Sequence, residues 1–521
     1  MVLGASAQAQ TIDPFAAGAR WTRGAGGPAA WMAEEVHFAG RDQFLWGQAG
    51  GVAPHMALMR SDSAGPLVDR REGPLTGAAL VRRSAAGNRP DRVYSLLQTD
   101  PTASGLRDTD VYGFAPFDSS RNQDMAPVWS HPMGTAFSGE PFPKCNASGD
   151  RVVAAVWLSG QNAVQVDVLD GTSGALLSRG VWPGLALNAL EVSKDGERIA
   201  IAAGLDLYVL DGQNQLLHHS MQMTTIPDLA LSANGDRLVA GGMGGARLFE
   251  ADASGYMEID WIPAHVLGSR AQQSVSSRVD LSDDGGTLAV AQWSYTGGQE
   301  TAFELWNLNT GVRTFRQVQA AGAGGLQNLP TGAHITADGR RAAFASWGNG
   351  VDPEVQLVDR DSAAVVAEFD LVGSAFDIDL DESGTRIAVA HKMTHAQMFH
   401  AQGAFALLDS GERELQALSA ARPGHALHMA AGRSDAGIVL WLVGTPGPEV
   451  LVAGVSGTLL LDRSRVAVRA SLADPNGAAQ MTLNVPSNWS AHELPFAVQA
   501  AFRTQTGTVL TAELLEPISL E

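Results

Sequence analysis

The sequence predicts an all-β protein built from a repeated antiparallel sheet, and two observations carry this prediction. A polar turn containing Gly, followed by an alternating apolar strand, returns six times between residues 146 and 391. The chain also contains 58 Gly and 24 Pro, which together with little helical periodicity favour many turns between short strands. At 521 residues, of which 45% are hydrophobic and 17% charged, the chain has enough apolar surface to bury a large core.

Each copy of the repeat has the chemistry of a tight hairpin. The copies begin at Asn146, Ser193, Ser232, Ser282, Thr336 and Asp381. In SKDGERIAIAA, Ser193 offers a side-chain oxygen to backbone N–H groups of the turn, and Gly196 supplies the positive φ that a tight turn requires. The glycines recur about every 40 to 55 residues, the length of a unit of four short strands. Each copy therefore predicts the first two strands of such a unit.

The third and fourth strands follow from a second apolar run that ends in Asp or Asn. These runs cover residues 164–170, 207–211, 303–309 and 355–359, and a short turn and another strand follow each of them. Two weaker units can be traced upstream, through FAGRDQFLWGQ at Phe38 and SAAGNRPDRVYSLLQ at Ser84. The count is then eight units, or seven if one of them is an insertion. Residues 20–24 are the candidate strand for closing a ring of such units.

The repeat carries a family resemblance. Ser-x-Asp-Gly-x-Arg-apolar-Ala, followed by an apolar run into Leu-Asp, resembles the WD-repeat-like and YVTN-type β-propellers of secreted bacterial proteins, over about residues 140–421. The resemblance implies an eight-bladed, alternatively seven-bladed, β-propeller over residues 11–425. It says little about activity, because related propellers include docking proteins, lactonases and dehydrogenase subunits.

The repeat stops near Pro423, and residues 426–521 read as a separate domain of six or seven short strands. Its Asn-Val-Pro stretch at Asn484 and Ala-Val-Gln-Ala stretch at Ala497 look like the compact β-sandwich modules that end many secreted bacterial proteins. That resemblance implies an accessory or attachment module and no activity.

Charge and the N-terminus indicate the compartment and the partners. With 55 Asp and Glu against 35 Lys and Arg, the net charge of -20 disfavours nucleic acid and anionic membranes as partners. Residues 1–10, MVLGASAQAQ, end in a small-residue pattern that suits cleavage by a signal peptidase before Gln10. We therefore expect a secreted or periplasmic protein without a transmembrane segment. The single cysteine, Cys145, excludes an intramolecular disulfide.

The connections between the predicted strands are unequal in length. Turns between first and second strands are tight, whereas the second-to-third connections near residues 99–107, 293–301, 347–353 and 392–403 are long. Two crossovers between units, near residues 263–277 and 319–332, are long as well. All of these connections belong to one face, which is therefore the expected binding face. The alternative is neutral variation of loop length.

Candidate ligand-binding residues on that face are His265, Trp293, Tyr295, Trp347 and Asn349. Flat amphipathic rings provide contact area for a peptide or glycan at low entropic cost. The alternative is that Trp293 and Trp347, at the ends of second strands, cover the core between units.

A candidate metal site lies in the last long loop. His391, His395 and His400 alternate there with Met393 and Met398, a ligand set that would suit copper, and three His with water would suit zinc. A solvated His-rich loop is the alternative, and no cofactor is expected. No catalytic motif is found, and Asp195, Asp284 and Asp338 are interpreted as turn residues.

These observations favour a non-enzymatic scaffold that binds a protein or peptide. The alternatives are a propeller enzyme with a metal or cofactor at its centre, such as a lactonase-like hydrolase or an oxidoreductase subunit, and a carbohydrate-binding surface component. Several His, Asp, Glu or Asn side chains converging near the axis would favour the enzyme.

Overall fold

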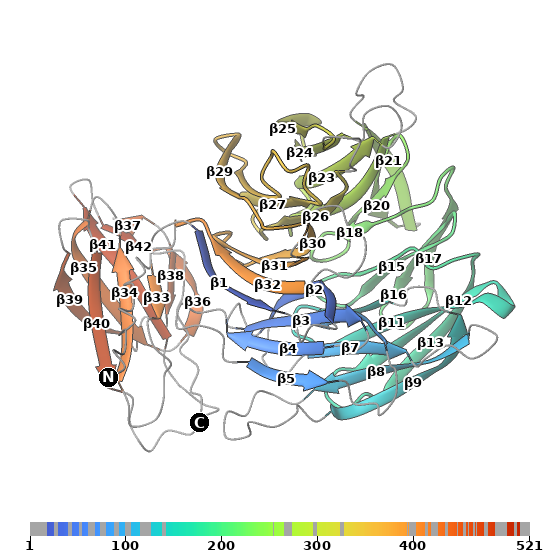
Figure 1. The fold of residues 1–521 in the computed structure, drawn as a ribbon, viewed down its shortest axis with the longest axis horizontal. Coiled ribbons are helices and arrows are strands. Elements are labelled where there is room, and N and C mark those ends of the chain that lie inside the picture. The colour runs from blue at the N-terminus through green and yellow to red at the C-terminus, as the bar shows by residue number, and fades with distance from the viewer. Residues whose placement is uncertain are drawn as a thin grey trace, which may run out of the picture. The chain divides into compact units, whose positions relative to one another are not determined.

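The computed structural model confirms an all-β protein (Figure 1). It describes residues 18–510 except 25–29, 40–43, 52–54, 61–67, 73–79, 88–92, 99–105, 115–126, 138–141, 254, 265–273, 295–299, 323–327, 393, 395–402, 412–414, 418–425, 433–435, 445, 452–454, 457, 462–463, 465, 474–477, 485–496 and 505–507. One short 3-10 turn, η1 (Ser159–Gln161), interrupts the strands. Residues 1–10, for which the sequence predicts a signal-peptide-like segment, lie outside the described part of the chain.

The chain divides into two compact units, which we call the repeat unit and the C-terminal unit. Residues 20–61 and 65–408 form the repeat unit, and the C-terminal unit consists mainly of residues 409–521.

The repeat unit contains eight four-stranded antiparallel sheets among its described residues. The first four are β2–β5 (Ala30–Ala39, Phe44–Gly51, His55–Arg60, Val68–Glu72), β6–β9 (Leu80–Ala86, Val93–Gln98, Leu106–Phe114, Pro127–Phe137), β10–β13 (Phe142–Cys145, Arg151–Leu158, Ala163–Asp170, Leu176–Pro183) and β14–β17 (Ala189–Val192, Arg198–Ala203, Asp206–Asp211, Leu216–Met221). The next three are β18–β21 (Leu229–Leu231, Arg237–Gly242, Gly245–Asp252, Gly255–Pro263), β22–β25 (Ser274–Leu281, Thr287–Ser294, Thr301–Asn307, Val312–Gln319) and β26–β29 (Pro330–Ile335, Arg341–Ser346, Val355–Asp359, Ala364–Phe369).

The eighth sheet joins the two ends of the repeat unit. It consists of β30 (Ala375–Leu380), β31 (Arg386–Lys392), β32 (Gly403–Asp409) and β1 (Gly18–Gly24), so its fourth strand comes from the start of the chain. This pairing is the one expected for residues 20–24. The first strands of successive sheets contact one another from β2 to β30, and β30 also contacts β2. The arrangement is compatible with a β-propeller.

The turns between first and second strands have the predicted chemistry. The six repeat glycines all have φ between +66° and +76°; they are Gly149, Gly196, Gly235, Gly285, Gly339 and Gly384. In the β14–β15 turn, the Oγ of Ser193 accepts a hydrogen bond from the N–H of Arg198 at 2.9 Å and donates to Asp195 at 2.6 Å. Asp195 accepts the N–H of Glu197 as well, which accounts for the repeated turn acids as structural groups.

The turns of Ser193, Ser232 and Ser282 are also bonded to the turn of the next sheet. The N–H of Asp195 donates to the carbonyl of Ala233, the N–H of Ala233 to that of Asp283, and the N–H of Asp283 to that of Ala337, at 3.3, 3.0 and 2.9 Å. We call this side of the repeat unit, with the first-to-second and third-to-fourth connections, the turn face. The opposite side, with the other connections, is the loop face.

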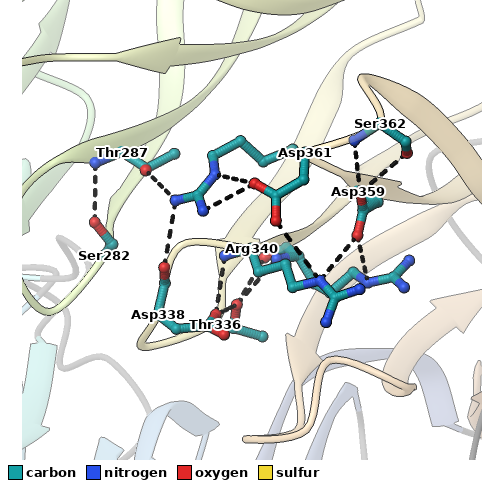
Figure 2. A network of polar contacts seen from close by, with 10 residues as sticks. Ser282, Thr287, Thr336, Asp338, Arg340, Asp359, Asp361 and Ser362 are labelled. Carbon is teal, nitrogen blue, oxygen red and sulfur yellow. Dashed lines mark hydrogen bonds and ion pairs between the residues drawn. The ribbon is translucent and has the colours of Figure 1, made fainter. Parts of the chain in front are cut away.

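Polar side chains reinforce the turn face between neighbouring sheets (Figure 2). Arg360, which follows β28, donates to the Oγ1 of Thr287 on β23 at 3.1 Å and to the carbonyl of Asp338 at 3.4 Å. The Nε atoms of Arg340 and Arg341 each lie 3.2 Å from Oδ2 of Asp359. Polar contacts thus hold the turns of these two sheets together.

Apolar side chains fill the space between sheets. One cluster joins β10–β12 to β14–β16 and includes Val153, Val166, Ile199 and Leu210, all fully buried. Another joins β2–β4 to β31 and β32, so the first and last sheets share a core. Alternation therefore buries both sides of the inner strands, such as β12, whereas fourth strands such as β13 stay largely exposed.

The C-terminal unit has its own core. Its described strands form a three-stranded sheet, a five-stranded sheet and a two-stranded ribbon. In hydrogen-bonding order they are β33 (Leu415–Ala417), β34 (Ala426–Gly432) and β40 (Ala478–Asn484); β37 (Val455–Ser456), β42 (Thr508–Leu510), β41 (Ala497–Thr504), β35 (Ala436–Gly444) and β39 (Ala467–Leu472); and β36 (Pro446–Leu451) with β38 (Thr458–Leu461). Trp441 and Phe502 of the larger sheet share a buried cluster with Met429 and Met481 of the smaller one. In the described residues, no helix is long and apolar enough to span a membrane.

Candidate functional site

The structure describes four of the eight sequence-predicted candidates, and these four lie on the loop face. Trp293, Trp347, Asn349 and His391 are described, and His265, Tyr295, His395 and His400 lie outside the described residues. The long connections occur where expected, between β23 and β24, β27 and β28, β31 and β32, β21 and β22, and β25 and β26.

The two tryptophans are half-buried at the ends of second strands. Trp293 is the second-last residue of β23 and lies opposite Val275 and Thr301, its partners on the two neighbouring strands of the sheet. Trp347 follows β27, and its ring lies 6.0 Å from the ring of Phe376 on β30 of the next sheet. The Trp347 ring therefore packs between two sheets.

Asn349 determines the shape of the loop between β27 and β28. Its Oδ1 accepts the N–H groups of Val351 and Asp352 at 2.9 and 2.7 Å, and its Nδ2 donates to the carbonyl of Ala320 at 2.8 Å and to Asp352 at 2.7 Å. Both ends of the amide are engaged, and the bond to Ala320 ties two connections of the loop face together.

His391 and Lys392 end β31 and are almost completely buried. The Nζ atom of Lys392 lies 5.5 Å from the ring centre of Trp347 and 5.4 Å from that of Phe376, as in cation–π contacts. Burial lowers the pKa of the Lys392 ammonium and of the His391 imidazole. Among the described residues, no group of three His, Cys, Asp or Glu side chains could hold a metal ion.

The loop face also carries exposed apolar side chains that the sequence does not single out. In the described part of the repeat unit, every exposed large apolar residue that lies between strands belongs to a loop-face connection. These residues are Leu185, Leu205, Met223, Met243, Val351 and Val372, with exposed fractions from 41% to 87%. The remaining exposed large apolar side chains of these sheets lie within fourth strands.

Four of these residues lie on connections that approach one another or the ends of two fourth strands. We define the loop-face band as Leu185, Leu205, Met221, Met223, Met243 and Trp261, from three consecutive sheets.

The first half of the band joins the sheets of β10–β13 and β14–β17. A Cβ placed on Gly204 would lie 3.6 Å from Cβ of Leu185, so the β15–β16 turn contacts the preceding connection. The N–H of Gln222, between Met221 and Met223, donates to the carbonyl of Leu205 at 2.7 Å.

The second half joins the sheets of β14–β17 and β18–β21. The N–H of Met243 donates to Oγ1 of Thr224 at 3.3 Å, which brings the β19–β20 turn beside the methionines. A Cβ on Gly244 would lie 3.8 Å from the Trp261 ring. Methionine is flexible and polarisable and adapts to varied apolar partners, so the band has the composition of a binding surface.

A second concentration of functional groups lies on the first strands. Ionisable side chains on or beside these strands include Glu35 and His37 on β2, Arg83 on β6, Lys144 on β10, Glu191 on β14, Asp228 before β18, Arg278 and Asp280 on β22, His334 on β26, and Asp377 and Asp379 on β30. Residues two apart on a strand point to the same side, so the pairs on β2, β22 and β30 each face one way. His334 joins two sheets, with Nδ1 3.6 Å from Asp379 and 4.0 Å from Asp280.

Most of these carboxylates bind the backbone of the next first strand. Asp377 and Asp379 accept the N–H groups of Val36 and Phe38 at 3.0 and 2.7 Å. In the same way Asp280 accepts the N–H of Ile335 at 2.9 Å. Asp228 and Glu35 accept the N–H groups of Val279 and Ser84, at 3.0 and 2.6 Å. These bonds give the carboxylates a structural function between sheets.

Burial changes the pKa of several of these groups. It raises the pKa of Asp280 and of Asp377 to about 7 and lowers that of His334. Burial also raises the pKa of Glu35, but the charges and hydrogen bonds of Arg83, 2.7 Å away, and of His37 together outweigh burial and hold the Glu35 pKa at about 2. Asp280 keeps 31% of its side-chain surface exposed, so solvent protons reach it.

No protein-family model matches the chain, and a search of curated proteins gives no match.

Proposed function

We propose that the repeat unit is an eight-bladed β-propeller of the WD-repeat-like or YVTN type and that it binds a protein or peptide through its loop face. The contacts between successive first strands and the pairing of β1 with β32 support the propeller. In this proposal the protein is exported to the periplasm or beyond, and the C-terminal unit is a β-sandwich-like accessory module.

One observation carries the binding function: the two faces differ in chemistry. Groups on the turn face make hydrogen bonds between sheets. In the described part of the repeat unit, the exposed large apolar residues that lie between strands are all on the loop face. Exposed contiguous apolar surface costs solubility and is typical of interaction sites.

The enzyme alternative has less support. The carboxylates of the first strands are the groups that a catalytic centre would use, but five of them accept backbone N–H groups of a neighbouring strand. Their arrangement supports a structural function.

A peptide display selection against the purified full chain tests the proposal. The selected peptides are measured against Met223→Ser with Met243→Ser, and against Leu177→Ser with Val312→Ser as a matched change of exposed apolar side chains on fourth strands. We expect the loop-face variant to weaken most selected peptides about ten-fold or more, because apolar anchors dominate such contacts, and the control to change affinity by less than about two-fold. Peptides that bind the loop-face variant as tightly as the wild-type chain would contradict the proposal.

A further inference from the structure

Four consecutive first strands bring acids and imidazoles side by side. Asp280 lies on β22, His334 on β26, Asp377 and Asp379 on β30, and His37 on β2. Nδ1 of His334 lies 3.6 Å from Asp379 and 4.0 Å from Asp280, and His37 interacts electrostatically with Asp377 and Asp379. We call these five residues the closing arc, because β2 and β30 are the first strands of the first and last sheets of the repeat unit.

The closing arc fastens neighbouring sheets to one another. Each of its three carboxylates accepts an N–H group of the next first strand. The pairs are Asp280 with Ile335 at 2.9 Å, Asp377 with Val36 at 3.0 Å, and Asp379 with Phe38 at 2.7 Å. The first pair joins β22 to β26, and the other two join β30 to β2 at the junction between the two ends of the repeat unit.

The closing arc contains no permanent cation. Among the described residues, no Lys or Arg side chain lies within 4.0 Å of its carboxylates. Arg278, two residues before Asp280, donates instead to two backbone carbonyls. Charges at longer range act on Asp280 or His334, and they belong to Lys144, Lys194 and Glu191. The charge balance of the closing arc therefore depends on groups that titrate.

Two other junctions between first strands have fixed charges instead. Glu35 on β2 pairs with Arg83 on β6 at 2.7 Å, and Glu191 on β14 pairs with Lys144 on β10 at 2.9 Å. The pKa of Glu35 is about 2, and the pKa of Lys144 is raised because the charge of Glu191 outweighs burial. Glu35 and Lys144 therefore keep their charges when the pH changes near 7.

The closing arc loses protons as the pH rises through neutrality. Burial raises the pKa of Asp280 and of Asp377 to about 7. Burial lowers the pKa of His37, but the neighbouring carboxylates outweigh it and raise that pKa above the usual 6.5. Burial holds the pKa of His334 below 6.5, so this imidazole is already uncharged in the same range. Where the pKa is higher in the folded than in the unfolded state, stability is lost as the pH rises through the folded value.

We propose that the closing arc is a proton-controlled fastener, which holds the first and last sheets together while it is protonated and loosens their junction as the pH rises above about 7. Loss of the protons leaves Asp280 and Asp377 ionised beside other carboxylates without a cation, and burial and repulsion both penalise these charges. The junction of β30 with β2 therefore opens locally before the junctions with fixed charges do. This property goes beyond the binding function of the loop face and does not depend on it.

Hydrogen exchange of the full chain, followed by mass spectrometry between about pH 6 and 8.5, tests this inference. Peptides that contain Val36 and Phe38 report on the junction of β30 with β2. Peptides that contain Ser84, whose N–H is accepted by Glu35 at 2.6 Å, report on a junction with fixed charges. After correction for the intrinsic pH dependence of exchange, we expect protection at Val36 and Phe38 to fall about ten-fold and protection at Ser84 to change less than about two-fold.

Two variants separate the closing arc from other acids of the first strands. Asp280→Asn with Asp377→Asn removes two titrating carboxyl groups and keeps amide oxygens that can accept the same N–H groups, so it should remove most of the pH dependence at the junction of β30 with β2. Asp228→Asn is the matched control, because Asp228 accepts an N–H group of β22 in the same way but lies outside the closing arc. We expect this control to retain the wild-type pH dependence.

Two results would overturn the inference. One is an equal loss of protection at Ser84 and at Val36, which would show a uniform loss of stability in place of a local opening. The other is a wild-type pH dependence in the double Asn variant. The comparison of the two junctions in the wild-type chain decides the matter even where a variant fails to fold.

Discussion

Gly235 illustrates how a single residue position meets two separate demands. Its φ is +73°, a region that side chains with a Cβ rarely adopt, and an added Cβ would overlap Cγ of Arg198 from the preceding sheet. The same glycine thus permits both the hairpin and the close approach of two sheets. Sequence reasoning foresees the first demand, because turn chemistry is local, but the second depends on a neighbour 37 residues away.

Gly311 separates these two effects experimentally. It has φ +66° in the turn after β24, with open space where a Cβ would stand. We expect Gly311→Ala to reduce the free energy of unfolding by about 1 kcal/mol through backbone strain, and Gly235→Ala to reduce it by about 2 to 4 kcal/mol because overlap is added. Urea denaturation measures both, and equal losses would show that the turns of adjacent sheets are not packed as described.

Asp377 and Glu354 predict a pH dependence of stability. Burial raises the pKa of both carboxyl groups to about 7, from usual values of 3.8 for Asp and 4.5 for Glu. The folded state then holds more protons than the unfolded state between these values, so the stabilisation is complete below the unfolded pKa and is lost as the pH rises through 7. Buried His334, with its lowered pKa, acts oppositely below about pH 6.5.

The window from pH 6.5 to 8 therefore isolates the carboxyl groups. We expect the melting temperature to fall by a few degrees, on the order of 1 kcal/mol or more, across this window. Asp377→Asn with Glu354→Gln should remove most of the dependence and leave the share of Asp280, since each amide oxygen can still accept the N–H of Val36 or Leu371. A double variant with the wild-type slope would refute the assignment.

At the scale of elements, β1 has a special position because it is the fourth strand of a sheet whose other strands lie at the opposite end of the repeats. Its loss would leave the edge of β32 open, and open edges promote self-association. The sequence indicates this closing strand only through position, since residues 18–24 lack the repeat pattern.

Two truncations test the contribution of β1. Removing residues 1–24 should lower the free energy of unfolding by several kcal/mol, roughly the sum of the lost ladder hydrogen bonds and packing, and should favour aggregates. Removing residues 1–17 keeps β1 and serves as the control. Matching denaturation curves and identical monodisperse scattering for the two truncations would argue against a closing strand.

At the scale of the whole molecule, the sequence predicts the repeated turns and strands but not the residues that come together from different sheets. The turns recur with their glycines, so the all-β architecture and the upstream sheets at Phe38 and Ser84 follow from pattern alone. The loop-face band combines residues between 185 and 261 that lie in short connections or near strand ends, which an argument from loop length overlooks. The sequence shows that acids occur at every second residue of some first strands. Their hydrogen bonds to the next sheet become apparent only in the structure.

The start of the C-terminal unit shows the same limit. The sequence places it at residue 426, whereas β33 at Leu415–Ala417 already pairs with β34. A three-residue strand carries too little periodicity to be recognised before its partner is known.

The pairing of β1 with β32 also constrains the order in which the molecule is made. Residue 24 leaves the ribosome about 380 residues before β32 does, so the last sheet has no fourth strand, and β1 no partner, through most of synthesis. Closure must be a late event that joins the two ends of a long chain, the kind of distant contact that slows folding and exposes strand edges meanwhile. In a nascent chain of this protein, the backbone edges of β1 therefore stay unpaired until β32 has been synthesised and can pair with it.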